Sequence, residues 1–320
     1  MNEEMYELLD DNLLQKTSVT IEGLKTSIKI ENCGIMETYS IFPGVILAFI
    51  DFQNEDLSGV FTENYESSRF LAINHCIDGR YSYMLEDDKL VYFGRGDLCI
   101  VVSEVTKTIS NFPLGYYKGL ELFMDVDIAN EHIRNYIPDF DLIDFYNKLK
   151  EDKGYFLVRS NEKIDHVIGE LYDVDERICE SYYKLKSLEL LLFFSITKFS
   201  NNETFSLSKN QVEIIENVRE DLINNLDSKI TLDELSKKYG ISKTSLKNCF
   251  KEVYGKPIFK WRKEYKLDYA CKLLNQNEQN ISEISRAVGY SSPSKFTQAF
   301  KDYVGYTPSE YKAKYVDNLL

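Results

Sequence analysis

Two short stretches in the last third of the chain carry polar side chains of a similar kind. They are Lys243, Thr244, Lys247, Asn248 and Lys251 in the first stretch, and Ser294, Lys295, Thr297, Gln298 and Lys301 in the second. No Asp or Glu is among these ten residues, whereas a generic solvated helix face usually mixes both signs. Lysine neutralises phosphate, and amide or hydroxyl side chains hydrogen-bond to base edges. The chemistry indicated is contact with a nucleic acid.

Both stretches occupy the same place in an internal repeat. Each copy has a Glu six residues before a Gly and a Phe five residues before a second Gly, namely Glu234, Gly240, Phe250 and Gly255, then Glu283, Gly289, Phe300 and Gly305. Between the first Gly and the Phe, the copies differ by one residue, ten against eleven. The extra residue therefore falls in the turn that follows the first Gly.

Each copy predicts a helix, a turn and a second helix. Gly240 and Gly289 supply the left-handed backbone conformation of a sharp turn. Ser242 and Ser292 are suited to cap the second helices, and Pro293 fits the first helical position. Apolar side chains four apart in each second helix should pack inward, namely Leu246 and Phe250, then Phe296 and Phe300. The polar stretches are left on the outer faces.

Residues 212–314 resemble the DNA-binding domain of the AraC/XylS family of bacterial regulators. The resemblance is carried by the run Ile281-Ser282-Glu283-Ile284-Ser285-Arg286-Ala287-Val288-Gly289-Tyr290, with Phe296, Phe300, Gly305, Thr307, Pro308 and Tyr311. Trp261, Lys266, Ala270, Leu273 and Leu274 resemble the family's long connecting helix, where Arg usually stands in place of Lys266. Residues 247–251 and 291–296 are most similar to the subset that includes the pyochelin-siderophore regulator.

This resemblance implies that two recognition helices enter successive major grooves of double-stranded DNA, one turn or about 34 Å apart. By their positions, the expected base contacts are Thr244, Lys247, Asn248, Ser294, Thr297 and Gln298. The expected phosphate contacts are Lys243, Lys251, Lys295 and Lys301. The resemblance also implies a transcription regulator, an activator by analogy, which would have RNA polymerase as a partner.

The rest of the chain is predicted to sense a signal. Short β-branched runs between turn signals over residues 17–125 favour a small antiparallel barrel or sandwich. The family resemblance implies a cupin-like β-barrel. Helical periodicity follows over about 128–150, 162–180 and 183–199. The last helix is so apolar that we expect it in a core or at a homodimer interface formed by Leu188, Leu191 and Phe194.

The predicted fold class is therefore α+β and multidomain. A barrel sensor domain spans residues 1–127, a helical dimerisation segment 128–200, and a linker 201–210. An all-α DNA-binding domain spans 211–320, with helix-turn-helix units at about 231–254 and 281–304.

The charge is divided unevenly along the chain. Residues 206–320 carry 19 Lys and Arg against 15 Asp and Glu, and the remainder carries 19 against 37. Such asymmetry indicates different partners for the two parts. We expect the acidic part to bind a small-molecule effector of unknown identity. The alternative is a basic protein partner. The numerous aromatic residues of the predicted strands are expected to form a core or, less readily, to line an effector pocket.

A third interpretation is a cupin-type metalloenzyme, which needs two or three histidines and a carboxylate around one metal. The chain has only His75, His132 and His166, with no His-x-His pair. We therefore expect no catalytic site, metal or cofactor. The acidic start of the chain has no signal-peptide pattern, no apolar run approaches the roughly 20 residues of a membrane span, and the six cysteines lack Cys-x-x-Cys spacing. These features predict a cytoplasmic protein with reduced thiols.

Overall fold

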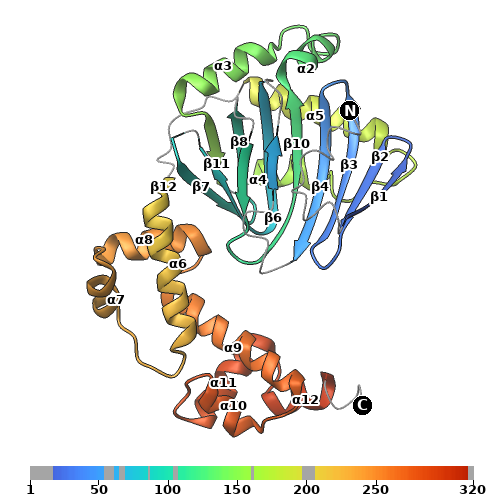
Figure 1. The fold of residues 1–320 in the computed structure, drawn as a ribbon. Helices are drawn as coiled ribbons and strands as arrows, with labels where there is room; N and C mark the ends of the chain where they lie inside the picture. Colours follow the sequence, from blue (N-terminus) through green and yellow to red (C-terminus); the bar gives the residue numbers. More distant parts are fainter. Residues whose placement is uncertain are drawn as a thin grey trace. The chain divides into compact units, whose positions relative to one another are not determined.

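The structure is a computed structural model that describes residues 17–53, 61–64, 69–85, 87–103, 107–159, 162–196 and 206–315. Its contacts divide the chain into two compact units, Met1–Ser208 and Lys209–Leu320, which Figure 1 shows as a sheet-rich and an all-helical part. Residues 201–205 of the predicted linker and residues 316–320 lie outside the described residues. Residues 206–210, also expected in the linker, instead belong to a strand and to the first helix of the second unit.

The described part of the first unit contains one antiparallel sheet of twelve strands. The strands are β1 (Thr17–Glu22), β2 (Lys25–Ile30), β3 (Gly34–Phe42), β4 (Val45–Gln53), β5 (Phe61–Asn64), β6 (Phe70–Met84), β7 (Lys89–Gly94), β8 (Leu98–Ser103), β9 (Lys107–Asn111), β10 (Tyr116–Asp125), β11 (Tyr155–Val158) and β12 (Ser206–Ser208). Their main order is β1-β2-β3-β4-β10-β6-β7-β12. The long strand β6 also pairs with β8 and β9, which in turn pair with β11 and β5.

The sheet does not close into a barrel. Closure needs the first strand to pair with a strand from the far end of the sheet. Among the described residues β1 pairs only with β2, and most of its side chains are exposed, as at an edge. The expected cupin-like barrel is therefore not confirmed. The sheet also continues past residue 127, because β11 and β12 come from the segment that we expected to be helical or a linker.

Both faces of the sheet carry buried side chains, because successive residues of a strand point to opposite faces and the two sets belong to different cores. On β4, Val45 and Leu47 belong to one core, whereas Ile50 and Phe52 belong to the other. The second core also holds Tyr81 and other aromatic side chains that we had considered as pocket lining. For these side chains the core interpretation holds.

Within the described residues of this unit, four helices accompany the sheet: α2 (Val126–Ile133), α3 (Leu142–Asp152), α4 (Glu162–Gly169) and α5 (Cys179–Ser195). The helix expected over 128–150 is thus two helices. Pro138 disfavours helical backbone at the residue before it. Asp141 then starts α3 by accepting hydrogen bonds from the backbone N–H groups of Ile143 and Asp144, both at 3.0 Å. Similarly, the helix expected over 162–180 ends at Gly169.

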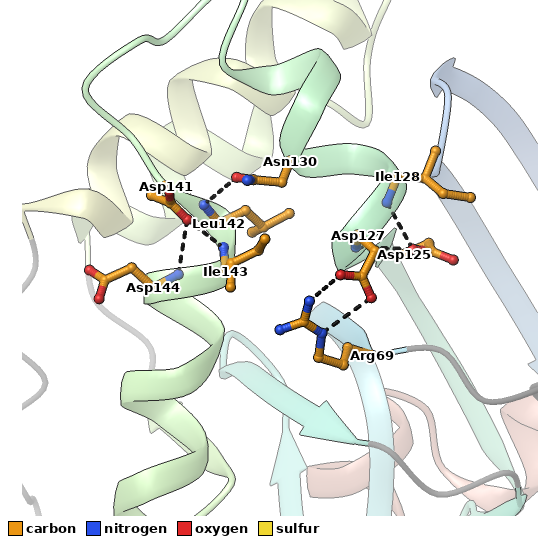
Figure 2. A network of polar contacts seen from close by, with 9 residues as sticks. All are labelled: Arg69, Asp125, Asp127, Ile128, Asn130, Asp141, Leu142, Ile143 and Asp144. Atoms are coloured by element: carbon orange, nitrogen blue, oxygen red, sulfur yellow. Dashed lines mark hydrogen bonds and ion pairs between the residues drawn. The ribbon is translucent and has the colours of Figure 1, made fainter.

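Polar contacts tie α2 and α3 to each other and to the start of β6 (Figure 2). Asp125 caps α2 by accepting from Asp127 N at 3.1 Å. The Arg69 guanidinium, next to β6, pairs with the Asp127 carboxylate. Buried Asn130 of α2 accepts a hydrogen bond from Leu142 N at 2.8 Å, which joins the two helices. The break between the helices is therefore a fixed corner.

Helix α5 packs on the sheet and crosses behind it in Figure 1. Its Leu191 and Phe194 are each 1% exposed and lie in the core that the helix shares with the strands, where Leu188 is packed against them. These side chains contact their own sheet, so assigning Leu191 and Phe194 to a dimer interface is wrong. The opposite face of α5 carries an exposed apolar stripe, which consists of Leu185 (66% exposed), Leu192 (49%) and Ile196 (81%).

The second unit is built from seven helices in the range that the structure describes. They are α6 (Lys209–Asn224), α7 (Leu232–Tyr239), α8 (Lys243–Tyr254), α9 (Ile258–Gln276), α10 (Ile281–Ala287), α11 (Pro293–Val304) and α12 (Pro308–Tyr315). In the described ranges of the whole chain, no helix combines the length and apolar character that crossing a membrane requires. The six cysteines are all free.

Replacing Leu191 by Ala should lower the free energy of unfolding by about 2–5 kcal/mol, because it leaves a cavity in a packed core. Ile128→Ala, at an exposed apolar residue of α2, should change it by no more than about 0.5 kcal/mol. Urea unfolding followed by far-ultraviolet circular dichroism measures both. The single Trp, Trp261, lies in the second unit, so its fluorescence should report little of the change. Equal losses from the two variants would contradict the buried placement of Leu191.

A candidate nucleic-acid interface

Local capping sets where each helix of the first repeat begins and ends. Thr231 and Glu234 form a capping box at the start of α7, which ends at Gly240 with φ of 63°. Ser242 then starts α8 by accepting a hydrogen bond from Ser245 N at 3.1 Å. These interactions satisfy backbone groups that a helix end leaves unpaired. They place Lys243 at the first position of α8.

The second repeat is built in the same way with one difference. Asn280 and Glu283 form a capping box at the start of α10, and Gly289 has φ of 73°. Ser292 is the N-cap residue of α11, as expected, although its side chain makes no capping hydrogen bond, and Pro293 follows at the first helical position.

The apolar faces of α8 and α11 are buried and the polar faces point outward. Leu246, Phe250, Phe296 and Phe300 are all fully buried. Thr244, Lys247 and Asn248 are exposed on α8, and Ser294 and Gln298 are exposed on α11, where Thr297 is half-buried. All four lysines expected to contact phosphate are exposed as well, namely Lys243, Lys251, Lys295 and Lys301. The structure thus brings the predicted residues of each copy onto one helix.

Two acidic residues that the sequence analysis missed contact these polar faces. Lys243 Nζ lies 2.7 Å from Asp233 Oδ1 on α7, and this contact holds the pKa of Asp233 below its ordinary value. Gln298 Nε2 donates to Asp302 Oδ1 at 2.6 Å. The spacing of four residues on one helix was a usable signal for the second pair. The two carboxylates therefore take up part of the hydrogen-bonding capacity of Lys243 and Gln298, each of which keeps further donors for other contacts.

Helix α9 belongs to the cores of both repeats. Near its start, the Trp261 ring lies 5.5 Å from the rings of Phe250 and Tyr254 of the first repeat. Further along, Leu267, Ala270, Leu273 and Leu274 share a core with Phe296 and Phe300 of the second. Half-buried Lys266 lies over the ring of Tyr290, with Nζ 5.9 Å from the centroid, and burial lowers its pKa. One helix therefore carries both outward-facing helices.

The three histidines are not brought together. His75 is buried on β6, where its Nδ1 lies 3.2 Å from the Tyr172 hydroxyl, and His132 and His166 lie on α2 and α4. Throughout the part of the chain that the structure describes, no three His, Cys, Asp or Glu side chains are grouped to hold a metal ion. The histidine set of the metalloenzyme interpretation is thus absent there.

Comparisons with known proteins match this second unit. A family described as "Helix-turn-helix domain" matches residues 235–314. The HTH-type transcriptional regulator ExsA of Pseudomonas aeruginosa is 36% identical over 78 residues, which cover 24% of this chain and 28% of ExsA. The virulence regulon transcriptional activator VirF of Yersinia enterocolitica is 34% identical over 79 residues, which cover 25% of this chain and 29% of VirF. The match thus spans less than a third of each relative.

Among solved structures, ToxT from Vibrio cholerae is similar over 84% of this chain and 98% of its own, with 15% identity and a TM-score of 0.31. The sequence matches concern a DNA-binding domain rather than a catalytic one. With the duplicated helix pairs, the capping boxes and the shared α9 in place, residues 235–314 are a helix-turn-helix domain of the AraC type.

Proposed function

We propose that this protein is a sequence-specific transcription regulator that binds double-stranded DNA through α8 and α11. The observation that carries the proposal is the pair of exposed polar faces, each with two or more lysines, held on one shared helix. Each face can enter a major groove, and grooves one turn apart lie about 34 Å from each other. If the DNA must bend to meet both faces, the bending costs a free energy of about 1–6 kcal/mol.

Within these faces, we assign base contacts to Thr244, Lys247 and Asn248 in the first groove and to Ser294, Thr297 and Gln298 in the second. Asn and Gln side chains match adenine, Lys matches guanine, and the Thr methyl group matches the methyl group of thymine. The flanking lysines Lys243, Lys251, Lys295 and Lys301 neutralise phosphates, which fixes register without reading sequence.

The direction of control that we propose is activation, with RNA polymerase as a partner in the cytoplasm. Support comes from VirF, whose name describes it as a transcriptional activator. The first unit would hold the controlling signal, a small-molecule effector. A basic protein partner is the second candidate, because outside residues 206–320 the chain has 37 acidic against 19 basic residues.

A homodimer is part of the proposal, and its interface would be the exposed stripe of α5. Leu185, Leu192 and Ile196 lie seven and four residues apart, so they share one face of the helix. Three large apolar side chains exposed on one helix face favour burial against a partner. A second copy offers the same apolar stripe, as a two-fold symmetric contact requires.

The full-length protein should prefer one family of duplexes, selected from a random pool, by about 10³-fold or more over random competitor. Fluorescence anisotropy at several salt concentrations measures both affinity and charge contacts. Lys251→Ala should weaken binding on every duplex and reduce the salt slope by about 0.9. Lys148→Ala on α3 removes an equal charge from the other unit and should change neither. Absence of any sequence preference in the unaltered protein would remove the proposed function.

Gln298→Ala should relax sequence preference at one base position and cost about 1–3 kcal/mol there, because the amide no longer reads that base. Selection and anisotropy on single-base variants of the preferred duplex measure this effect. Asp302→Asn is the control, because it weakens the hydrogen bond that Gln298 donates to residue 302 but keeps the Gln298 amide that reads the base. An equal loss on all duplexes would show that Gln298 has no base-reading role.

The double variant Leu192→Asp and Ile196→Asp should shift the protein from dimer to monomer in light scattering, because it buries two charges in the proposed interface. Ile128→Asp alters an exposed apolar residue on α2 instead and should leave the dimer mass unchanged. A double variant that remains dimeric would place the interface elsewhere.

A further inference from the structure

The loop that precedes the first repeat is tied to α9 by a buried arginine. Arg262 of α9 is 7% exposed, and its Nη2 donates to Asn225 O at 2.6 Å and to Ser228 O at 2.9 Å. These two carbonyls bracket the loop at residues 225–228, which follows α6 and leads to α7. A planar guanidinium holds such a pair of acceptors in a fixed geometry. Burial lowers the pKa of Arg262, and nearby Asp227 opposes that shift.

The turn of the second repeat lies directly against the same loop. A Cβ added at Gly289 would overlap the Leu226 carbonyl oxygen and come within 2.7 Å of Asp227 Cα. The next residue, Tyr290, is covered by Lys266 of α9, whose charge interacts with Asp227. The loop, α9 and the second turn therefore meet at one place.

The corresponding glycine of the first repeat has no such contact. Gly240 has φ of 63°, close to the 73° of Gly289, yet a Cβ there would meet nothing within 4 Å. Both glycines provide the left-handed turn that the helix pair needs. The close approach at Gly289 is thus not a requirement of the helix-turn-helix itself. It belongs to the contact between the second repeat and the loop that precedes the first.

We propose that Arg262, Gly289 and the loop at residues 225–228 form a brace that fixes the angle between α8 and α11 and thereby sets the spacing of DNA half-sites that the protein accepts. This inference rests on the proposed function. A shared helix sets the distance between two bodies along its axis, but a contact off that axis is needed to stop their rotation about it. The brace supplies that contact, and Arg262 and Gly289 act as positioning residues.

The test uses the full-length protein and the duplex selected by it, with zero, one or two base pairs inserted between the half-sites. Two added base pairs rotate one half-site by about 70°. The unaltered protein should lose affinity by about tenfold or more across this series. Gly289→Ala and Arg262→Met should lose less than about threefold, while their affinity for each half-site alone stays within twofold of the unaltered protein.

Gly240→Ala is the matched control, because it strains the same type of turn without touching the loop, and it should keep the unaltered spacing profile. Thermal melting by circular dichroism checks that each variant is folded. If Gly289→Ala is unfolded, the spacing profile of Arg262→Met alone tests the inference. Spacing profiles identical to that of the unaltered protein in the folded brace variants would overturn the inference.

A DNA-free measurement separates this inference from the proposed function. Spin labels attached to keto amino acids at positions 247 and 301 leave the native cysteines unmodified and report the distance between α8 and α11. This distance distribution should broaden in Arg262→Met and stay narrow in Gly240→Ala. A narrow distribution in both would overturn the brace, even if no duplex sequence were preferred by the protein.

Discussion

The sharing of α9 between two small cores is the constraint on which the second unit depends. Neither repeat has enough apolar surface of its own, since α7 buries little beyond Leu235 and α10 little beyond Ile284 and Ser285. Trp261 completes the first core and Leu267 to Leu274 complete the second. Because both cores close on one rigid helix, folding of either repeat orders the helix that the other needs. The two outward faces are thereby held at a fixed distance along α9.

The positions of the acidic residues explain how a strongly acidic chain can present lysine-rich faces. The charge surplus lies outside the second unit, and within that unit capping positions hold several of its acids. Glu234 and Glu283 lie at helix starts, where the unpaired backbone N–H groups stabilise a negative charge. Asp233 and Asp302 lie closer to the polar faces and pair with Lys243 and Gln298. They act as internal competitors for any ligand of those two side chains.

In the first unit, the open sheet carries buried side chains on both faces. One face receives α5, and the Tyr39, Phe49 and Tyr183 rings meet there at centroid distances of 4.8–6.0 Å. The capped corner between α2 and α3 holds these helices at the ends of β6 and β10. Helix α5 carries apolar side chains on two sides, and these sides have different roles. One side fills the core, and the other carries the exposed stripe.

The helix-turn-helix repeat, its outward residues and most of the helix starts in the second unit follow from the amino-acid sequence alone. These features depend on interactions within about a dozen residues, such as the pairing of Thr231 with Glu234 or the turn at Gly240. Strand-rich composition likewise predicted a sheet. By contrast, the open sheet, the inward Leu191 and outward Leu192 of α5, and the contact of Gly289 with the loop at residues 225–228 arise from long-range packing. Those outcomes depend on contacts between segments that are distant in the sequence. The spacing of residues within one segment does not predict which of these contacts form.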